Sequence, residues 1–555
     1  MNKKVCSFPI LFALLALLVG TCAVVFPASA QAAPTSTGSI TVSGTVARSY
    51  DAYQIFSANV VDGDSDANIA TDLAWASDAV RDAALPVLHS AGMPNSQATA
   101  QEAAEWLTTD SHLTSALSAQ LARYLQSSDA VSVALNAGKT AELSCGYWLI
   151  VADDDAIAQG EVGTAPVMAL VGGSAVTVKP KAATPKVAKH VLEDSTAAWQ
   201  KAADATVADD LYWRLSATVP AGLTAYDTYT VRFVDTMSAG LDPSKVAASM
   251  RVYVAARADG GFDAVSAGKD GRAGTEPAKG WTDITAQCAT KVAADGTFTV
   301  RTGDLIAALG GADAFTVGAR VVAVYNAPLN SACSHGIAKG NSNEVYLRYP
   351  CSPLADQSAD AGFTRTPSDD ACAYTWDLAL TKRGSDGDKP LSGAVLSITD
   401  DRGRTLAADG TWDAEGKATV TTGEDGRVTV SGVDSGKLEV REFKAPKGYA
   451  AFEGTRSVTV KAEGLDVDQV AAAKPKLTVT AESPLRADSA DGSTGSLEAS
   501  LINTPTGTPP SITTGGFMPS TGDMAMYAAA AAAVAGAALI VVALLVKRGG
   551  GGHKE

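Results

Sequence analysis

The chain has few of the residues on which enzymes and metal sites usually depend. Its 555 residues include five histidines and seven cysteines, and the cysteine spacing matches no zinc pattern. It has no HExxH, GxGxxG or GxSxG motif, so the signatures of zinc proteases, dinucleotide enzymes and α/β-hydrolases are missing. We therefore predict no metal, no cofactor and no turnover of a substrate.

Positive charge is scarce as well. Lysine and arginine together number 44 against 60 aspartate and glutamate residues, which gives a formal net charge of −16. An acidic chain repels phosphate backbones, so we expect no nucleic-acid partner. The run 62–66 looks like the start of a calcium loop, but Ala67 stands where that loop requires glycine and Leu73 where it requires glutamate, which excludes an EF-hand.

Residues 1–30 have the features of a secretory signal peptide. A basic start precedes an apolar run over 8–26, and Ala28-Ser29-Ala30 offers the small residues of a cleavage site before Gln31. Cys22 leaves a lipoprotein alternative open, although the residues before it fit a lipobox poorly. We therefore expect the mature chain to be exported.

The C-terminus has four parts in order. Residues 504–517 are uncharged and rich in proline, threonine and glycine, which is typical of an extended spacer. The pentapeptide 518–522 follows, then an uncharged run over 526–546 that is long enough to cross a bilayer, then a basic tail. A plain single-span protein could have the span and the tail alone, so the pentapeptide decides the interpretation.

The pentapeptide Met518-Pro519-Ser520-Thr521-Gly522 resembles the LPXTG sorting signal of Gram-positive surface proteins, with Met518 where leucine is usual. The resemblance implies that a sortase cuts between Thr521 and Gly522 and joins Thr521 to an amine. The predicted transmembrane segment 526–546 would hold the precursor in the membrane until then. With 518–555 as sorting signal, we expect a secreted protein anchored to peptidoglycan at the cell surface; the sortase class stays open.

Between these ends the composition predicts three domains: 35–180, 181–350 and 373–503. The second and third are rich in β-branched segments separated by Gly and Asp turns, and closely spaced strands of this kind are typical of β-sandwiches. A less regular linker over 351–372 separates them. We predict a mainly β chain of tandem immunoglobulin-like sandwiches, with a transmembrane helix at the C-terminus.

The first domain differs from the other two because it adds helices. It opens with an alternating strand at 39–46. Two stretches, 67–88 and 98–125, are rich in Ala and Leu at helical spacing, so we predict a helix over each.

Three separated motifs mark residues 373–503: Lys382 at the end of a strand, Glu442 within LEVREFKAPKGY (438–449), and Asn503 in the closing strand. The segment 438–449 resembles the pilin E-box, YxLxETxAPxGY, and the domain resembles collagen-adhesin B-type immunoglobulin domains. In that family a lysine and an asparagine join spontaneously in an isopeptide bond. The resemblance implies a bond between Lys382 and Asn503, with Glu442 as proton shuttle.

The proposed chemistry requires residues of these types. An amine attacks only when neutral, and burial lowers the pKa of a lysine and raises that of a carboxylic acid, so both can be neutral at pH 7. The protonated acid can then polarise the amide carbonyl and relay protons while ammonia leaves. The alternative is a surface ion pair that contributes under about 1 kcal/mol.

Residues 181–350 contain a similar set and resemble the fimbrial isopeptide-forming middle domain. The resemblance implies a bond between Lys189 and Asn343, with Asp235 as proton shuttle. Lys186 and Asn341 lie close by in the sequence and remain alternatives. Turn or cap positions are the other explanation for the aspartate and the asparagines.

Val176-Thr177-Val178-Lys179-Pro180-Lys181 joins the first two domains and resembles the pilin motif WxxxVxVYPK, with Gly172 in place of the tryptophan and Lys179 in place of the tyrosine. The resemblance implies that Lys181 is the pilus cross-linking nucleophile, which accepts Thr521 of the next subunit. The alternative is an ordinary solvated linker lysine.

Five cysteines remain after removal of the signal peptide, and an odd number outside the cell leaves at least one thiol. We hypothesise disulfides Cys351–Cys372 and Cys288–Cys333, with Cys145 buried and free. The connectivity itself cannot be deduced from a sequence.

The mature chain resembles the major (backbone) pilins of Gram-positive bacteria over nearly its whole length. This implies a structural shaft subunit of a covalently polymerised, sortase-assembled pilus, or fimbrium, rather than an enzyme. Its partners would be a sortase, other pilin subunits and peptidoglycan. A monomeric wall-anchored adhesin or a minor pilin is the alternative, and the sequence identifies no host-surface ligand.

Overall fold

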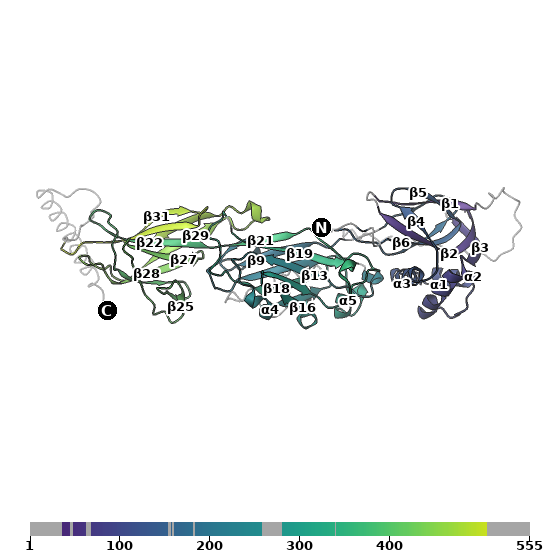
Figure 1. The fold of residues 1–555 in the computed structure, drawn as a ribbon, viewed down its shortest axis with the longest axis horizontal. Helices are drawn as coiled ribbons and strands as arrows, with labels where there is room; N and C mark the ends of the chain where they lie inside the picture. The colour runs from purple at the N-terminus through teal and green to yellow at the C-terminus, as the bar shows by residue number, and fades with distance from the viewer. Residues whose placement is uncertain are drawn as a thin grey trace, which may run out of the picture.

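The computed structural model describes residues 36–44, 48–62, 68–153, 157, 160–180, 184–221, 223–257, 280–338 and 340–507. The chain is mainly β, as expected, and three modules lie in a row along its long axis (Figure 1). We call them the first module (36–180), the middle module (184–374) and the C-terminal module (376–507). The signal peptide, Lys181, the sorting motif and the predicted span 526–546 all lie outside the described residues.

The first module packs helices against two sheets. One sheet has the order β5-β1-β8, and the other has the order β3-β2-β6-β7 with β4 on β2. The bounds are β1 Thr37–Val42, β2 Ser49–Asp62, β3 Asn68–Trp75, β4 Ser132–Asn136, β5 Thr140–Ser144, β6 Gly146–Ala152, β7 Val167–Val171, β8 Val176–Val178, α1 Asp78–Ser90, α2 Ala100–Thr108 and α3 Ser115–Gln126.

Both predicted helices differ from those in the structure: the first begins later than expected, and the second is divided into two. Residues 68–75 of the stretch 67–88 are strand β3, which pairs with β2, and the helix begins only after Ser77, whose hydroxyl accepts the Val80 N–H at 3.2 Å. The stretch 98–125 is two helices with separate N-caps. A capping box at Thr99 starts α2, and Thr114 starts α3.

The middle module is a sandwich of two sheets. One has the order β10-β9-β12-β18-β14-β15; the other has the order β11-β21-β19-β13-β17-β16 with β20 on β19. The bounds are β9 Val187–Glu193, β10 Ala198–Gln200, β11 Ala202–Asp204, β12 Tyr212–Thr218, β13 Arg232–Met237, β14 Arg251–Ala255, β15 Thr282–Asp283, β16 Ala289–Val292, β17 Thr297–Arg301, β18 Arg320–Asn326, β19 Asn341–Pro350, β20 Phe363–Arg365, β21 Asp369–Tyr374, α4 Val246–Ser249 and α5 Leu305–Ala308.

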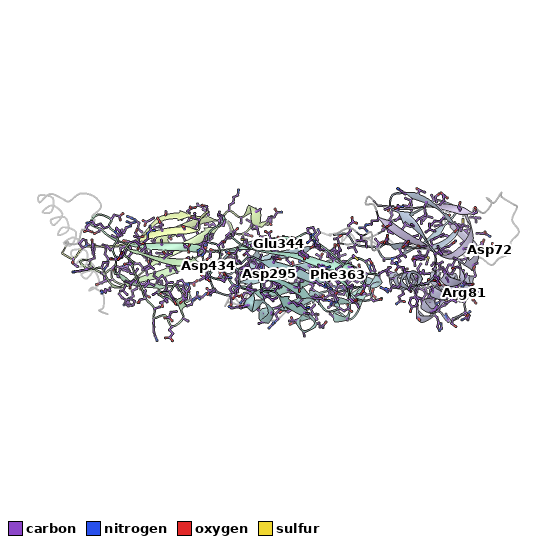
Figure 2. All side chains as sticks on the ribbon, viewed as in Figure 1. Asp72, Arg81, Asp295, Glu344, Phe363 and Asp434 are labelled. Atoms are coloured by element: carbon purple, nitrogen blue, oxygen red, sulfur yellow. The ribbon has the colours of Figure 1, made fainter. Side chains whose placement is uncertain are left out.

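Residues 351–372, expected as a linker, contribute β20 and most of β21 to the second sheet of the middle module. Phe363, the first residue of β20, lies toward the end of this module that faces the first one (Figure 2). The core between the two sheets includes Trp213, Phe233 and Leu347, none of which is exposed.

The C-terminal module is also a sandwich. Its sheets have the orders β27-β22-β32-β31 and β25-β24-β23-β28-β29-β30, with β26 on β23. Its first and last strands, β22 and β32, are parallel neighbours. The bounds are β22 Trp376–Gly384, β23 Val395–Thr399, β24 Thr405–Leu406, β25 Trp412–Asp413, β26 Val420–Thr421, β27 Arg427–Val433, β28 Gly436–Lys444, β29 Thr455–Glu463, β30 Lys476–Ala481, β31 Leu485–Asp491 and β32 Ser496–Asn503.

Buried contacts connect the modules. Val162 of the first module belongs to the middle core, and Leu354 of the middle module packs against the first core. At the other junction the indole of Trp376 donates to Asp204 at 2.6 Å. Asp434 lies between the same two modules (Figure 2), where burial is the main cause that raises its pKa and the nearby Asp204 carboxylate is the second. No helix within the described ranges is long and apolar enough to span a membrane.

Candidate functional site

The middle module brings Lys189, Asp235 and Asn343 into one buried centre, which we call the middle centre. Lys189 lies on β9 in one sheet, while Asp235 on β13 and Asn343 on β19 lie in the other. Asp235 is paired with Val345, two residues from Asn343, so both polar side chains point to the same face of the sheet. That face is the interior of the sandwich, and all three residues are fully buried.

Tyr325, on β18, connects the members of the middle centre. Its hydroxyl accepts a hydrogen bond from Lys189 Nζ at 2.9 Å and one from Asn343 Nδ2 at 2.8 Å, and it donates to Asp235 Oδ2 at 3.2 Å. Lys189 Nζ also contacts Asp235 Oδ2 directly. The sequence motifs do not single out Tyr325, because its role depends on strand register.

Burial shifts both titrating groups of the middle centre toward their neutral forms. Burial lowers the pKa of Lys189 to about 8, and the nearby Asp235 only partly opposes this. Burial likewise raises the pKa of Asp235 to about 6, against the opposing effect of Lys189. Transfer of one proton from the amine to the carboxylate therefore costs much less here than it would in water, and it creates the neutral amine that nucleophilic attack requires.

The two alternatives for this centre lie in different environments. Lys186 has an exposed side chain. Asn341 is buried, but its amide is saturated: Nδ2 donates to the carbonyls of Ser334 at 2.9 Å and Ala373 at 3.1 Å, and Oδ1 accepts the Ser334 N–H at 2.8 Å. The hydrogen bonds of Asn341 therefore go to the loop at Ser334 and to β21 rather than to Lys189.

The C-terminal module forms a second buried centre, the C-terminal centre, from Lys382, Glu442 and Asn503. Lys382 on β22 and Asn503 on β32 lie in one sheet on adjacent parallel strands, where Lys382 pairs with Leu501. Glu442 reaches them from β28 in the other sheet. The segment 438–449 forms most of β28 and a turn in which the Tyr449 N–H donates to the Pro446 carbonyl at 3.1 Å.

Contacts in the C-terminal centre run directly through the acid. Lys382 Nζ lies 3.4 Å from Glu442 Oε1, and Asn503 Nδ2 donates to both oxygens of Glu442 at 3.0 Å. Burial lowers the pKa of Lys382 to about 8, partly offset by Glu442. The amine also donates to the Leu501 carbonyl at 3.4 Å.

Both centres leave buried acceptors without a partner. Asn343 Oδ1 and Asp235 Oδ1 in the middle centre, and Asn503 Oδ1 in the C-terminal centre, accept no hydrogen bond from the described residues. A buried polar atom without a partner costs roughly 1–3 kcal/mol. A carboxylic acid in its protonated form could donate to such an amide oxygen, and that would activate the amide carbonyl for attack.

Both hypothesised disulfides are wrong in this structure. Cys372 on β21 pairs with Ser342 near the start of β19, whereas Cys351 follows the end of that ten-residue strand, about 30 Å away at the rise of a β-strand. A disulfide requires Cα atoms within about 7 Å.

Cys288 and Cys333 are separated in a similar way. Cys288 precedes β16 at the Arg232 end of β13, and Cys333 packs against Gly240, beyond the opposite end of β13. Burial raises the pKa of each thiol to about 11.

Comparison with known proteins gives one family match. Residues 377–474 match the model of the SpaA prealbumin-like fold domain. This match covers the strands that carry Lys382 and Glu442 but ends before Asn503.

Relatives and solved structures give further similarities. The chain is 29% identical over 143 residues to the trypsin-resistant surface T6 protein of Streptococcus pyogenes serotype M6, and it spans about a quarter of that relative (24%) and 24% of its own length. Among solved structures, the T6 backbone pilin of the same serotype has a TM-score of 0.46 at 16% identity, over 85% of this chain and 98% of that one. The full-length major pilin SpaD of Corynebacterium diphtheriae has a TM-score of 0.40 at 16% identity, over 84% and 98%.

Proposed function

We propose that this chain is the structural shaft subunit of a covalently polymerised, sortase-assembled pilus on a Gram-positive cell, stabilised by two autocatalytic Lys–Asn isopeptide bonds. The observation that carries the proposal is the burial of a lysine, an acid and an asparagine together in each of two successive modules. Two such sets in one chain are hard to explain as surface ion pairs, because unreacted buried charges are costly.

The proposed bonds suit a fibre under tension. In the C-terminal module the bond would join β22 to β32, the first and last strands, so a pulling force would pass along covalent bonds instead of shearing the sheet. In the middle module it would join β9 to β19, one strand in each sheet. The modules lie in a row (Figure 1), which is the arrangement a shaft requires.

Polymerisation would use two segments outside the described residues. A sortase would cut after Thr521 and join that residue to Lys181 of a neighbouring subunit. In the last subunit, Thr521 would be joined to peptidoglycan instead. The sequence similarity to a streptococcal surface protein is consistent with this location. The monomeric wall-anchored adhesin or minor pilin stays the second candidate, because the Lys181 motif lacks the tryptophan and the tyrosine of its pilin counterpart.

An immunoblot of boiled, SDS-treated wall extract from the native host tests the two candidates. A ladder of high-mass species that Lys181→Ala abolishes, while wall attachment persists, is the expected result. A single band near monomer mass in the unmodified strain would favour the adhesin or minor pilin instead.

A further inference from the structure

The two centres differ in how the acid reaches the amide nitrogen that must leave. In the C-terminal centre the acid contacts the amide nitrogen directly, because both oxygens of Glu442 accept a hydrogen bond from Asn503 Nδ2 at 3.0 Å. In the middle centre the acid is an aspartate, shorter by one methylene, and among the described residues Asp235 forms its hydrogen bonds with Lys189 and Tyr325 rather than with Asn343. The Tyr325 hydroxyl occupies that gap, 3.2 Å from Asp235 Oδ2 and 2.8 Å from Asn343 Nδ2.

We propose that Tyr325 is a catalytic residue of the middle centre, whose hydroxyl relays a proton from Asp235 to the nitrogen of Asn343 as that nitrogen leaves. This inference rests on the isopeptide chemistry proposed above. The contacts form a continuous path: Lys189 Nζ meets Asp235, Asp235 meets the phenol, and the phenol meets Asn343 Nδ2.

The step balances without any further reactant. Lys189 Nζ attacks Asn343 Cγ, the Nζ–Cγ bond forms and the Cγ–Nδ2 bond breaks. Nζ loses one proton to Asp235, the phenol gives its own proton to Nδ2 and regains one from Asp235, and Nδ2 departs as ammonia. The phenol and the carboxyl group finish as they began, so one amine and one primary amide become one secondary amide and ammonia.

The surroundings of Tyr325 fit a neutral relay. The residue is fully buried, and its ring packs edge-to-face with Phe298 with centroids 4.8 Å apart, which holds the hydroxyl in place. Lys189 Nζ lies 5.5 Å from the centroid of the Tyr325 ring, so the same side chain also lines the path of the nucleophile. Burial keeps the phenol protonated, as a relay requires, because it raises the pKa of Tyr325 well above its usual value.

The test uses full-length chain recovered unreacted from denaturant and diluted into buffer. Peptide mapping by mass spectrometry then follows the two cross-linked peptide pairs separately over time. Tyr325→Phe should slow formation of the Lys189–Asn343 bond by roughly 100-fold, the lower end of what general acid–base catalysis contributes, and leave the Lys382–Asn503 bond at its normal rate. Tyr349→Phe is the matched control, because it removes a different buried hydroxyl from the strand that carries Asn343, and this hydroxyl bonds to none of the described residues.

A second variant separates catalysis from packing. In the Tyr325→Phe background, Asp235→Glu lengthens the acid toward Asn343 and should restore at least part of the lost rate, whereas a packing defect would persist or worsen. Equal rates for Tyr325→Phe and Tyr349→Phe would overturn the relay. If the unmodified chain forms the C-terminal bond but never the middle bond, the proposed isopeptide chemistry fails for the middle module. If it forms neither bond, that chemistry fails for both modules. Both outcomes differ from failure of the relay, in which the middle bond forms at the same rate with and without the Tyr325 hydroxyl.

Discussion

In the middle module the lysine lies in one sheet and the acid and asparagine lie in the other, whereas in the C-terminal module the lysine and asparagine share a sheet and the acid comes from across the sandwich. The strands that supply the three groups therefore differ, yet both centres bury a lysine, an acid and an amide within reach of one another. What the centres share is a connected path from the amine through the acid to the amide nitrogen. The path is direct through Glu442 and indirect through Asp235 and Tyr325.

Removing either lysine should have the largest effect. Lys189→Ala and Lys382→Ala should each abolish one bond, so that the intact mass rises by one ammonia once the substitution itself is subtracted. Each bond closes a loop of more than 100 residues, so its loss should lower the free energy of unfolding by about 4–5 kcal/mol in the loop-entropy model. Intact-mass spectrometry and chemical denaturation measure the two effects.

The exposed Lys186 provides the control for the lysine variants. Lys186→Ala should keep both bonds and stay close to the stability of the unmodified chain. A Lys189→Ala chain that still shows two mass losses would refute the assignment of the middle bond.

Changing the length of the acid should affect the two centres differently. Glu442→Asp withdraws the carboxylate from Asn503, which Glu442 contacts directly rather than through a tyrosine hydroxyl, so the C-terminal bond should form about 100-fold more slowly. Asp235→Glu extends the acid toward Asn343 and should leave the middle rate within about tenfold. Glu442→Gln and Asp235→Asn cannot shuttle a proton, so they give the rate of bond formation without an acid in each centre. Equal slowing in both centres would contradict the idea that contact with the leaving nitrogen sets the rate.

Sequence motifs predicted much of this arrangement because they are local. Glu442 lies within the segment 438–449, and lysines and asparagines mark the strands on which the proposed bonds depend. The contacts to Tyr325 could not be predicted in this way, since the phenol meets a lysine that lies 136 positions away in the sequence. Only the registers of β9, β12 and β18 bring these two side chains into one core.

Two errors have equally specific physical causes. The stretch 67–88 has helix-forming composition, but residues 68–75 pair with β2 as a strand, and pairing overrides propensity. The Cys351–Cys372 hypothesis treated the stretch between the two cysteines as a free loop, whereas the chain there turns back along β19 and holds the cysteines near opposite ends of that strand.

The pH dependence of the middle centre is a more moderate expected effect. The pair holds both protons below about pH 6 and none above about pH 8, so attack by a neutral amine beside a protonated acid should be fastest between these values. The rate should fall about tenfold for each pH unit beyond either limit. Unreacted chain is diluted into buffers from about pH 4 to pH 10, a range that includes both pKa values, and peptide mapping then gives the rate of middle-bond formation at each pH.

The same pKa shifts make the unreacted module least stable where it reacts fastest. The folded pKa of Asp235 lies above its ordinary 3.8, so its contribution to stability falls as pH rises from 3.8 to about 6. The folded pKa of Lys189 lies below its ordinary 10.5, so stability recovers only as pH rises from about 8 to 10.5. Formation of the amide removes the charge of the lysine, so the stability minimum between about pH 6 and pH 8 should become shallower in the reacted chain. A rate of bond formation that rises monotonically from about pH 4 to pH 10 would argue against a proton shared by Lys189 and Asp235.

The smallest effect on bond formation should come from Asn341. Asn341→Ala removes an amide whose hydrogen bonds go to Ser334 and Ala373 rather than to Lys189, so the middle bond should still form. The variant should lose roughly 1–3 kcal/mol of stability, because the Ser334 N–H is left without its acceptor. Asn343→Ala should show the opposite pattern, with no middle bond at all. The two asparagines lie on one strand and are both buried, so each serves as the control for the other. If Asn341→Ala blocked the bond and Asn343→Ala did not, Asn341 would be the residue that bonds to Lys189.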